Sequence, residues 1–284
     1  LWLSPVPASA QPWILTDISV STTSEATGIN DDGLVTGYYT VGGTTHGFVR
    51  TVAPGFTDVG TLGGGHAIPR AANSLGQVVG YSYLAGNTLY HAFRWSASTG
   101  IQDIGTLGGS RSIAYGTNKV GQIVGWAHTA GNAQRAFLWT PGAGMVDLGT
   151  LGGTYSAARA INYLGQVTGY AYIAGDTYYH AFRWSPGGGP MVDLVTLGGN
   201  NSQGNGINNS GQVVGWAYDA AGNTRAFSRT GTAPMINLGT LGGTSSEADA
   251  VNNAGQVVGY AYTAAGERHA TIWSGPWKDL VVDF

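Results

Sequence analysis

The residues best suited to chemistry in this chain stand at one position of a repeat of about 44 residues. The occupants of that position vary between units, and in chain order they are Thr27, Arg70, Tyr115, Arg159, Asn205 and Asp249. The planar guanidinium of arginine forms paired, charge-assisted hydrogen bonds with a carboxylate. If the fold gathers these positions, they predict a ligand site. The alternative is a set of scattered ion pairs that only hold the fold together.

Acidic residues stand two residues earlier in the first and last units. The occupants of this second position are Glu25, Ile68, Ile113, Ala157, Gln203 and Glu247. If the repeat closes into a ring, Glu25, Glu247 and Asp249 would converge on one side of a central channel. Glycoside hydrolysis needs two carboxylates, about 5–5.5 Å or 6.5–9.5 Å apart. These three acids are therefore the catalytic candidates if the protein is an enzyme.

A basic residue opens one extended run of every unit. These residues are His46, His91, Arg135, His180, Arg225 and His269. They either cap backbone carbonyls or contact a ligand, and His91 and His180 are the candidates for ligand contact. Metal binding is not expected, because successive units hold these groups apart and a metal needs nitrogens about 2 Å from one centre.

Tyrosines gather at the expected loop tips of the second and fourth units. They are Tyr83, Tyr90, Tyr172, Tyr178 and Tyr179. Exposed tyrosines offer a flat apolar face with a polar end, which suits sugars. Tyr83 and Tyr172 therefore join the predicted ligand site, with packing between adjacent loops as the alternative.

The composition excludes several classes of chemistry. Of the 284 residues only 10% are charged, and the net charge of −3 argues against nucleic acid as a partner. The absence of cysteine excludes disulfides, thiolate metal sites and a cysteine nucleophile. No nucleophilic serine motif or phosphate-binding loop is present. We expect no cofactor and no bound metal.

The repeat itself predicts the elements that position these residues. Each unit contains versions of three phrases, D-L-G-T-L-G-G, A-x-A-I-N-x-x-G-Q-V-V-G-Y-A and H-A-F-R-W. The unit openings are Asp58, Asp103, Asp147, Asp193 and Asn237. Short runs of β-branched and aromatic residues between glycines favour strands. In the fourth unit we expect strands near 157–162, 166–172, 180–184 and 191–197.

Four antiparallel strands per unit are typical of a propeller blade. The asparagine that begins each N-x-x-G phrase is expected to shape a hairpin turn. Phe93 and Trp95 are expected to pack on glycines such as Gly80 between neighbouring sheets. We predict an all-β, six-bladed propeller whose first strand is innermost. A fragment of a seven-bladed propeller is the alternative.

The two ends of the chain carry further signals. Residues 1–10 read L-W-L-S-P-V-P-A-S-A, and the small residues Ala8 and Ala10 match the end of an export signal. We expect residues 1–10 to be the remnant of such a signal and 11–284 to form one domain. Segments 13–18 and 277–282 both resemble a fourth strand, and one of them would close the ring. No apolar run is long enough to predict a transmembrane helix.

The phrases resemble the bacterial extracellular HAF repeat family. H-A-F stands at His91–Phe93 and His180–Phe182, and it drifts in other units, as at His269-Ala270-Thr271. The resemblance covers roughly residues 16–284, although the first unit has Ser19-Val-Ser-Thr22 in place of L-G-G. It implies export and a repeat fold, and it carries no catalytic residue.

Three functions remain open from the sequence. We favour an extracellular or periplasmic monomer that binds polysaccharide or a cell-surface glycan without catalysis. The predicted ligand-binding residues are Arg70, Tyr115, Arg159, Asn205, Asp249, His91, His180, Tyr83 and Tyr172. The first alternative is a polysaccharide lyase or glycosidase with its site at the channel mouth. The second is a structural surface protein that assembles with itself.

Overall fold

The computed structural model describes residues 23–51, 55–275 and 281–283, and the regular elements in these ranges are all β-strands. They form six antiparallel sheets of four consecutive strands each, which confirms the predicted all-β propeller fold. One parallel bridge, between Thr45 and His66, also links the first two sheets. The segments 1–10 and 13–18 lie outside the described residues.

The strands follow the repeat closely. The first strands are β1 (Ser24–Ile29), β5 (Gly63–Ala72), β9 (Gly108–Thr117), β13 (Gly152–Ile161), β17 (Gly198–Ile207) and β21 (Gly242–Val251). The second strands are β2 (Val35–Val41), β6 (Val78–Leu84), β10 (Ile123–Thr129), β14 (Val167–Ile173), β18 (Gln212–Asp219) and β22 (Val257–Thr263). The third strands are β3 (Thr44–Arg50), β7 (Tyr90–Ser96), β11 (Gln134–Thr140), β15 (Tyr179–Trp184), β19 (Thr224–Thr230) and β23 (Arg268–Trp273). The fourth strands are β4 (Thr57–Asp58), β8 (Gly100–Asp103), β12 (Gly144–Asp147), β16 (Val192–Asp193), β20 (Ile236–Asn237) and β24 (Val281–Asp283).

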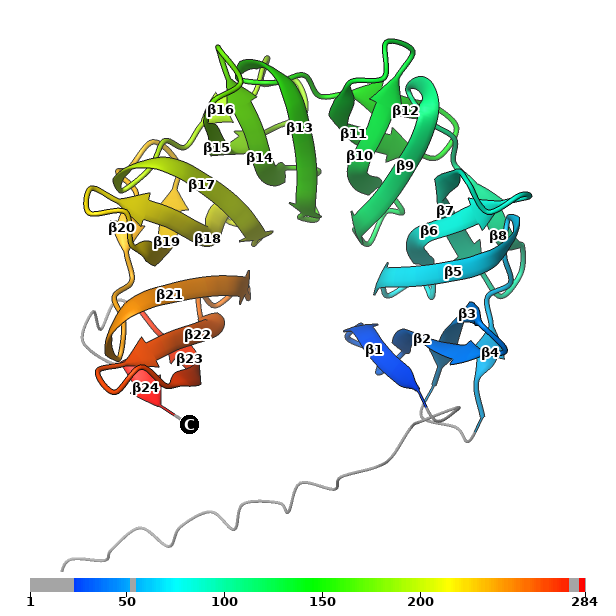
Figure 1. The fold of residues 1–284 in the computed structure, drawn as a ribbon, viewed down its shortest axis with the longest axis horizontal. Helices are drawn as coiled ribbons and strands as arrows, with labels where there is room; N and C mark the ends of the chain where they lie inside the picture. Colours follow the sequence, from blue (N-terminus) through cyan, green and yellow to red (C-terminus); the bar gives the residue numbers. More distant parts are fainter. Residues whose placement is uncertain (1–22, 52–54, 276–280, 284) are drawn as a thin grey trace, which may run out of the picture.

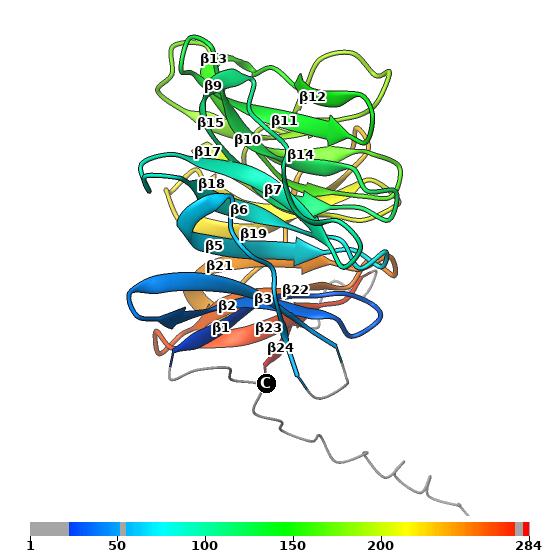
Figure 2. The ribbon, with the colours of Figure 1, turned by 90° about the vertical axis from the view of Figure 1, so that its right-hand side faces the viewer.

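The six sheets, or blades, are arranged around a central channel (Figure 1). Their first strands face the channel, as the sequence predicted, and seen from the side the blades form one layer of stacked sheets (Figure 2). Each blade packs against the next along the chain, but no comparable packing joins β1–β4 to β21–β24 within the described ranges. The blades therefore form an open arc, and the expected closure of the ring is not seen in this part of the chain.

The fourth strand of each blade comes from that blade's own segment of chain. At the C-terminal end β24 pairs with β23, through Thr271 opposite Asp283. In the first blade β4 pairs with β3, through Phe48 opposite Asp58. The C-terminal strand thus completes the last blade. Of the expected segment 277–282, residues 277–280 lie outside the described residues.

Asparagine shapes the turn between the first two strands of each blade. In the fourth blade the Oδ1 atom of Asn162 accepts a hydrogen bond from the Gln166 amide, and Gly165 has a φ of 76°. Only glycine adopts that region without strain. The predicted turn role is confirmed. The Nδ2 atom of Asn162 additionally donates to the Asn208 carbonyl of the next blade, 2.8 Å away.

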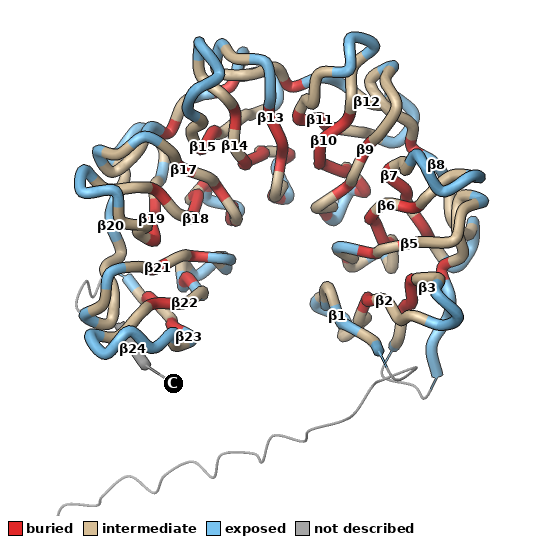
Figure 3. The backbone as a smooth tube through the Cα atoms, viewed as in Figure 1, coloured by how far each residue is buried: buried red, intermediate tan, exposed pale blue. Residues whose placement is uncertain are grey.

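Phenylalanines on glycines fill the spaces between blades. Phe182 is fully buried and stands opposite Gly169 in the β14–β15 ladder. It packs with Val124 and Ala136 of the preceding blade. A Cβ atom at Gly169 would lie 2.0 Å from the Ala157 carbonyl oxygen, so no larger residue fits. Buried residues accordingly run through the middle strands and the faces between blades (Figure 3).

Candidate functional site

The channel contains a cavity of about 380 Å³ on the first strands of the blades. We call it the channel cavity, and its lining residues are Thr27, Arg70, Tyr115, Arg159, Gln203, Asn205, Glu247 and Asp249. Alternate residues of a strand point to the same side, so one repeated position of each innermost strand reaches the channel. The structure thus brings together all six occupants of the variable position in the repeat.

One side of the channel cavity is basic. The guanidinium of Arg159 lies 4.5 Å from the ring centre of Tyr115 and 5.8 Å from that of Tyr170. The guanidinium of Arg70 lies 5.7 Å from the ring centre of Tyr81. Neither arginine forms an ion pair with a described residue, and the Nε atom of Arg159 is buried without a hydrogen-bond partner there. Both cations are therefore held by aromatic rings and remain available to an anion.

The opposite side is acidic and rich in amides. Glu247 accepts hydrogen bonds from the Tyr260 hydroxyl at 2.9 Å and from Asn205 Nδ2 at 3.0 Å. Burial, followed by this bond to Glu247, raises the pKa of Tyr260 to about 12, so its hydroxyl remains a donor. Crowding by protein atoms and then the charge of Glu247 raise the pKa of Asp249. The cavity thus places hydrogen-bond acceptors opposite two cations.

Glu25 does not join these acids. It does not line the channel cavity, and its carboxylate accepts a hydrogen bond from the Tyr38 hydroxyl of its own blade. The expected convergence of Glu25 with Glu247 depended on contact between the first and last blades. Because the arc is open on that side, this convergence is absent from the described structure (Figure 1).

A groove of about 480 Å³ adjoins the channel cavity between the first two blades. We call it the inter-blade groove, and it is lined by Tyr38, Thr45, His66, Ile68, Arg70, Tyr81, Tyr83 and Asn87. Arg70 lines both hollows and connects them. The groove therefore extends the charged cavity outward along a wall of tyrosine rings.

The predicted tyrosines belong to two larger aromatic clusters. Tyr83 lies 5.4 Å from Tyr90 between ring centres, and Tyr90 lies 6.3 Å from Trp126 of the next blade. Tyr172 lies 5.4 Å from Tyr179, which in turn contacts Trp216 at 6.1 Å. The sequence prediction omitted both tryptophans, although each stands at the same repeat position as Tyr81. These rings pack on one another, and Trp126 is buried.

Three of the histidines that open the third strands bind the aspartates of the D-L-G-T phrases. The distances between His Nδ1 and the carboxylate are 3.0 Å for His46–Asp58, 2.8 Å for His91–Asp103 and 2.9 Å for His180–Asp193. The expected capping of carbonyls by these histidines is therefore replaced by His–Asp pairing. Burial alone would raise the pKa of Asp193, but its hydrogen bonds from His180 and the Val195 amide lower it. The co-occurrence of His and Asp in these units was the sequence signal for the pairs.

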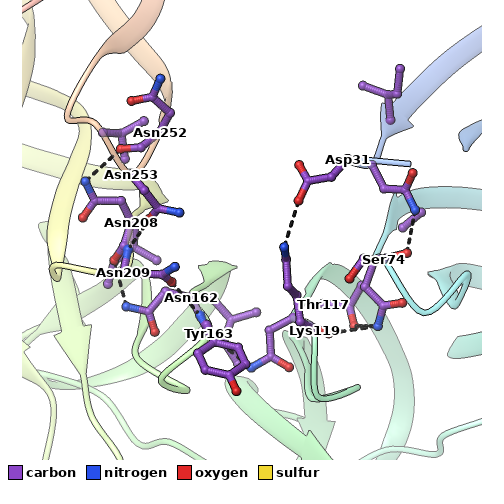
Figure 4. Close-up of a pocket in the computed structure, with 18 residues that line it drawn as sticks. Asp31, Ser74, Thr117, Lys119, Asn162, Tyr163, Asn208, Asn209, Asn252 and Asn253 are labelled. Carbon is purple, nitrogen blue, oxygen red and sulfur yellow. Dashed lines mark hydrogen bonds and ion pairs between the residues drawn. The ribbon is translucent and has the colours of Figure 1, made fainter. Parts of the chain in front are cut away.

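At the turns that follow the first strands, the channel has a second, amide-lined hollow of about 360 Å³ (Figure 4). Its asparagines bind the neighbouring blade, for example Asn209 Oδ1 with the Tyr163 amide at 3.0 Å. Lys119 and Asp31 form an ion pair of 3.0 Å between the third and first blades. Most of these asparagines take part in bonds between or within the blades, so this end is better suited to holding the blades than to binding a ligand.

Within the described ranges, no three His, Asp or Glu side chains are grouped so that they could hold a metal ion. The same residues include no helix with the length and apolar character needed to cross a membrane.

No protein-family model matches the chain, and no curated protein matches its sequence. Solved structures do match. The β-propeller domain of the Trilobed protease from Pyrococcus furiosus, which has an open velcro topology, is 9% identical, with a TM-score of 0.57 over 92% of this chain and 84% of that one. The BP39L lectin from Burkholderia pseudomallei is 9% identical, with a TM-score of 0.52 over 89% and 81%.

TolB from Acinetobacter baumannii is 11% identical, with a TM-score of 0.50 over 73% of this chain. The matched part is 52% of TolB, so this chain spans about half of that protein. At these identities the likeness concerns the fold alone. The chain is a β-propeller related in fold to TolB and to a bacterial lectin.

Proposed function

We propose that this protein is an exported propeller of the HAF repeat kind that binds an acidic polysaccharide in the channel cavity and the inter-blade groove. The observation that carries the proposal is the pair Arg70 and Arg159, two cations in one cavity without ion-pair partners among the described residues. Each can form paired hydrogen bonds with a uronate carboxylate. The acceptors of Glu247 and Asp249 fit the sugar hydroxyl groups on the other side.

Two further features support a saccharide rather than another anion. The inter-blade groove continues from Arg70 along Tyr81 and Tyr83, whose rings suit the apolar faces of sugar units. The fold is shared with a protein named as a lectin, BP39L from Burkholderia pseudomallei. The proposal of export rests only on the sequence, namely on residues 1–10 and on the resemblance to the HAF repeat family.

Titration calorimetry with polygalacturonate and with neutral dextran tests the proposal. We expect binding of the acidic polymer, and Arg159→Ala should weaken it roughly 10–100-fold, since a hydrogen bond to a charged group contributes about 1.5–3 kcal/mol. Arg183→Ala is the matched control, because Arg183 lies on β15 of the same blade and outside the cavity. Equal binding by both arginine variants, or preference for dextran, would refute the assignment.

A glycosidase acting at the same cavity is the second candidate. The specific observation is the pair Glu247 and Asp249, of which Asp249 has a raised pKa, as a general acid requires. Release of reducing ends from polygalacturonate, abolished by Asp249→Asn, would establish catalysis. Binding of the polymer without such release would support the binding function and contradict the glycosidase function.

A further inference from the structure

A tyrosine ring fills the space between the second and third blades. Tyr90, which begins β7, lies 5.4 Å from both Tyr81 and Tyr83 of its own blade, measured between ring centres. It lies 6.3 Å from Trp126 of the next blade, and the guanidinium of Arg111 lies 5.3 Å from its ring centre. We call this space the tyrosine slot, and at this interface one flat ring occupies it.

The tyrosine slot between the fourth and fifth blades is filled in the same way. Tyr179 lies 5.3 Å from Tyr170 and 5.4 Å from Tyr172 of its own blade. Its ring centre is 6.1 Å from that of Trp216 in the next blade. Two interfaces thus share one arrangement, so the spacing of the blades leaves room for a ring at this position of the repeat.

The slot between the first and second blades has no tyrosine at this position. Thr45 stands there in place of Tyr90, since it pairs with Thr40 in the β2–β3 ladder as Tyr90 pairs with Tyr83 in the β6–β7 ladder. A threonine side chain is far smaller than a phenol ring. Most of the slot is therefore left unfilled by this residue.

The inter-blade groove is this unfilled slot. Its volume is about 480 Å³, and Thr45 lies in its lining. Other lining residues stand at the repeat positions of the side chains that contact Tyr90. The corresponding pairs are Tyr38 with Tyr81, Tyr81 with Trp126 and His66 with Arg111. The groove therefore keeps the aromatic walls of the slot without the ring between them.

The groove also presents hydrogen-bond donors. The Nδ1 atom of His66 accepts from the Thr45 amide at 3.2 Å, so the proton of the neutral ring lies on Nε2, which bonds to no other described residue. The Oδ1 atom of Asn87 accepts from the Gly65 amide at 2.7 Å, and within the described ranges its Nδ2 atom has no acceptor. Arg70 adds a cation where the groove meets the channel cavity. These donors fit a ligand rich in oxygen atoms better than an aromatic side chain.

We propose that the inter-blade groove holds one pyranose ring of the acidic polysaccharide, placed where Tyr90 lies in the next interface, with its carboxylate on Arg70. The inference rests on the proposed function and makes Thr45 the residue that opens this interface to a sugar. A pyranose is close to a phenol ring in size and stacks its apolar face on aromatic rings. Its hydroxyl groups would accept from His66 and Asn87, and the adjoining sugar unit would reach the channel cavity past Arg70.

Filling the slot with a tyrosine tests the inference. Thr45→Tyr should weaken the binding of trigalacturonate in titration calorimetry roughly ten-fold or more, because the new ring takes the place of the sugar. The same variant should raise the Tm by about 1–4 °C, since it recreates the ring contacts that Tyr90 makes in the next interface. A structural role of Thr45 alone would predict no loss of binding.

Thr224→Tyr is the matched control. Thr224 pairs with Tyr218 as Thr45 pairs with Thr40, so it occupies the same repeat position, between the fifth and sixth blades. At that interface Asp249 stands at the repeat position of Arg70, which disfavours a uronate, and Thr224 does not line the channel cavity. We expect the control variant to bind trigalacturonate as the wild type does.

A second variant keeps the test decisive if Thr45→Tyr disturbs the fold, as circular dichroism would reveal. His66→Phe retains a ring in the wall of the groove and removes the Nε2 donor. It should weaken the binding of trigalacturonate roughly 3–10-fold, the effect of one lost hydrogen bond.

The outcomes distinguish this inference from the proposed function. If Arg159→Ala weakens binding and Thr45→Tyr does not, the groove holds no sugar, and the inference fails while the function stands. Equal weakening by Thr45→Tyr and Thr224→Tyr would also refute the inference. Binding of p-cresol that Thr45→Tyr abolishes would assign the groove to an aromatic side chain instead. A wild-type protein that binds neither trigalacturonate nor polygalacturonate would overturn both.

Discussion

Asp249 bears a carboxylate without a hydrogen-bond partner among the described residues, unlike its neighbour Glu247. Its raised pKa means that the folded protein favours the protonated form more than the unfolded chain does. The corresponding stability is fully present below the unfolded pKa of about 3.9 and is lost as the pH rises through the folded value. A charge that a ligand site requires thus destabilises the free protein at neutral pH.

We therefore expect Asp249→Asn to stabilise the protein at pH 7. Because the group is exposed and screened, the gain should be about 0.5 kcal/mol, or a rise of about 1–2 °C in Tm. The difference should disappear below about pH 4, where the wild-type carboxyl is also neutral. Thermal unfolding at several pH values measures it, and a lower Tm for the variant at pH 7 would contradict the assignment.

Val195 carries backbone strain that its counterparts avoid. It replaces the glycine of the D-L-G-T phrase and has a φ of 57°, where Gly105 and Gly149 have 78° and 83°. A β-branched residue is strained in this region. The turn survives because Asp193 Oδ1 accepts from the Val195 amide at 2.6 Å.

Val195→Gly should stabilise the protein by about 1 kcal/mol, since the strain relieved exceeds the entropy that glycine adds to the unfolded chain. Val195 is about half exposed, so little packing is lost. The reciprocal change, Gly149→Val, should destabilise by at least as much, although a Cβ there meets no atom within 4 Å. Urea unfolding of both variants tests this. Midpoints equal to that of the wild type would show that a positive φ imposes no strain on valine at this position.

At the scale of the elements, we expect the hydrogen bonds between blades to add to the stability that the turn bonds provide. Asn162 and Asn252 make the same turn bonds with the glutamine four positions on: Oδ1 accepts from its main-chain amide, and Nδ2 donates to its side-chain oxygen. Only Asn162 is buried and also bonds to the next blade, through the Asn208 carbonyl. The two asparagines therefore form a natural matched pair.

Asn162→Ala should destabilise the protein by about 2–3 kcal/mol, because it removes these three bonds and leaves the Asn208 carbonyl with its turn donor, the Gly211 amide, alone. Asn252→Ala should cost only about 1 kcal/mol, the value of an exposed turn bond. Denaturant unfolding gives both free energies. Equal losses would indicate either that the inter-blade bond contributes nothing or that Asn252 also has a partner blade in solution.

At the scale of the whole molecule, the open arc makes the blades unequal. Among the described residues, the middle blades pack against another blade on both faces, whereas the first and last blades do so on one face. In arrays of stacked repeats, stability is a sum of unit and interface terms, so end units open first.

Hydrogen exchange should therefore be faster in β2 and β22 than in β14. The measurement is best made at a low protein concentration, at which the chains do not associate. The protection of β14 should exceed that of β2 and β22 roughly ten-fold or more, because the loss of one interface costs about 1.4 kcal/mol. Equal protection of β2, β14 and β22 would mean that the ring is closed in solution.

The sequence by itself determined the blades. Its period, the Asn-to-Gly turns such as Asn162–Gly165 and the pairing of Phe182 with Gly169 are local or nearest-neighbour features, which repeat wherever the phrases repeat. It also predicted that the variable position faces the channel, since strand alternation and an innermost first strand require it. Arg70, Tyr115, Arg159, Asn205 and Asp249 were identified on this basis.

Only the tertiary structure decided what depends on the angle between blades. That angle accumulates along the arc and is set by side-chain packing, so the sequence could not indicate that the first and last blades remain apart (Figure 1). Glu25 was assigned to the acidic side on the assumption of closure and instead binds Tyr38. The ring contacts of Arg159 likewise depend on side-chain rotamers, which repeat phrases do not specify.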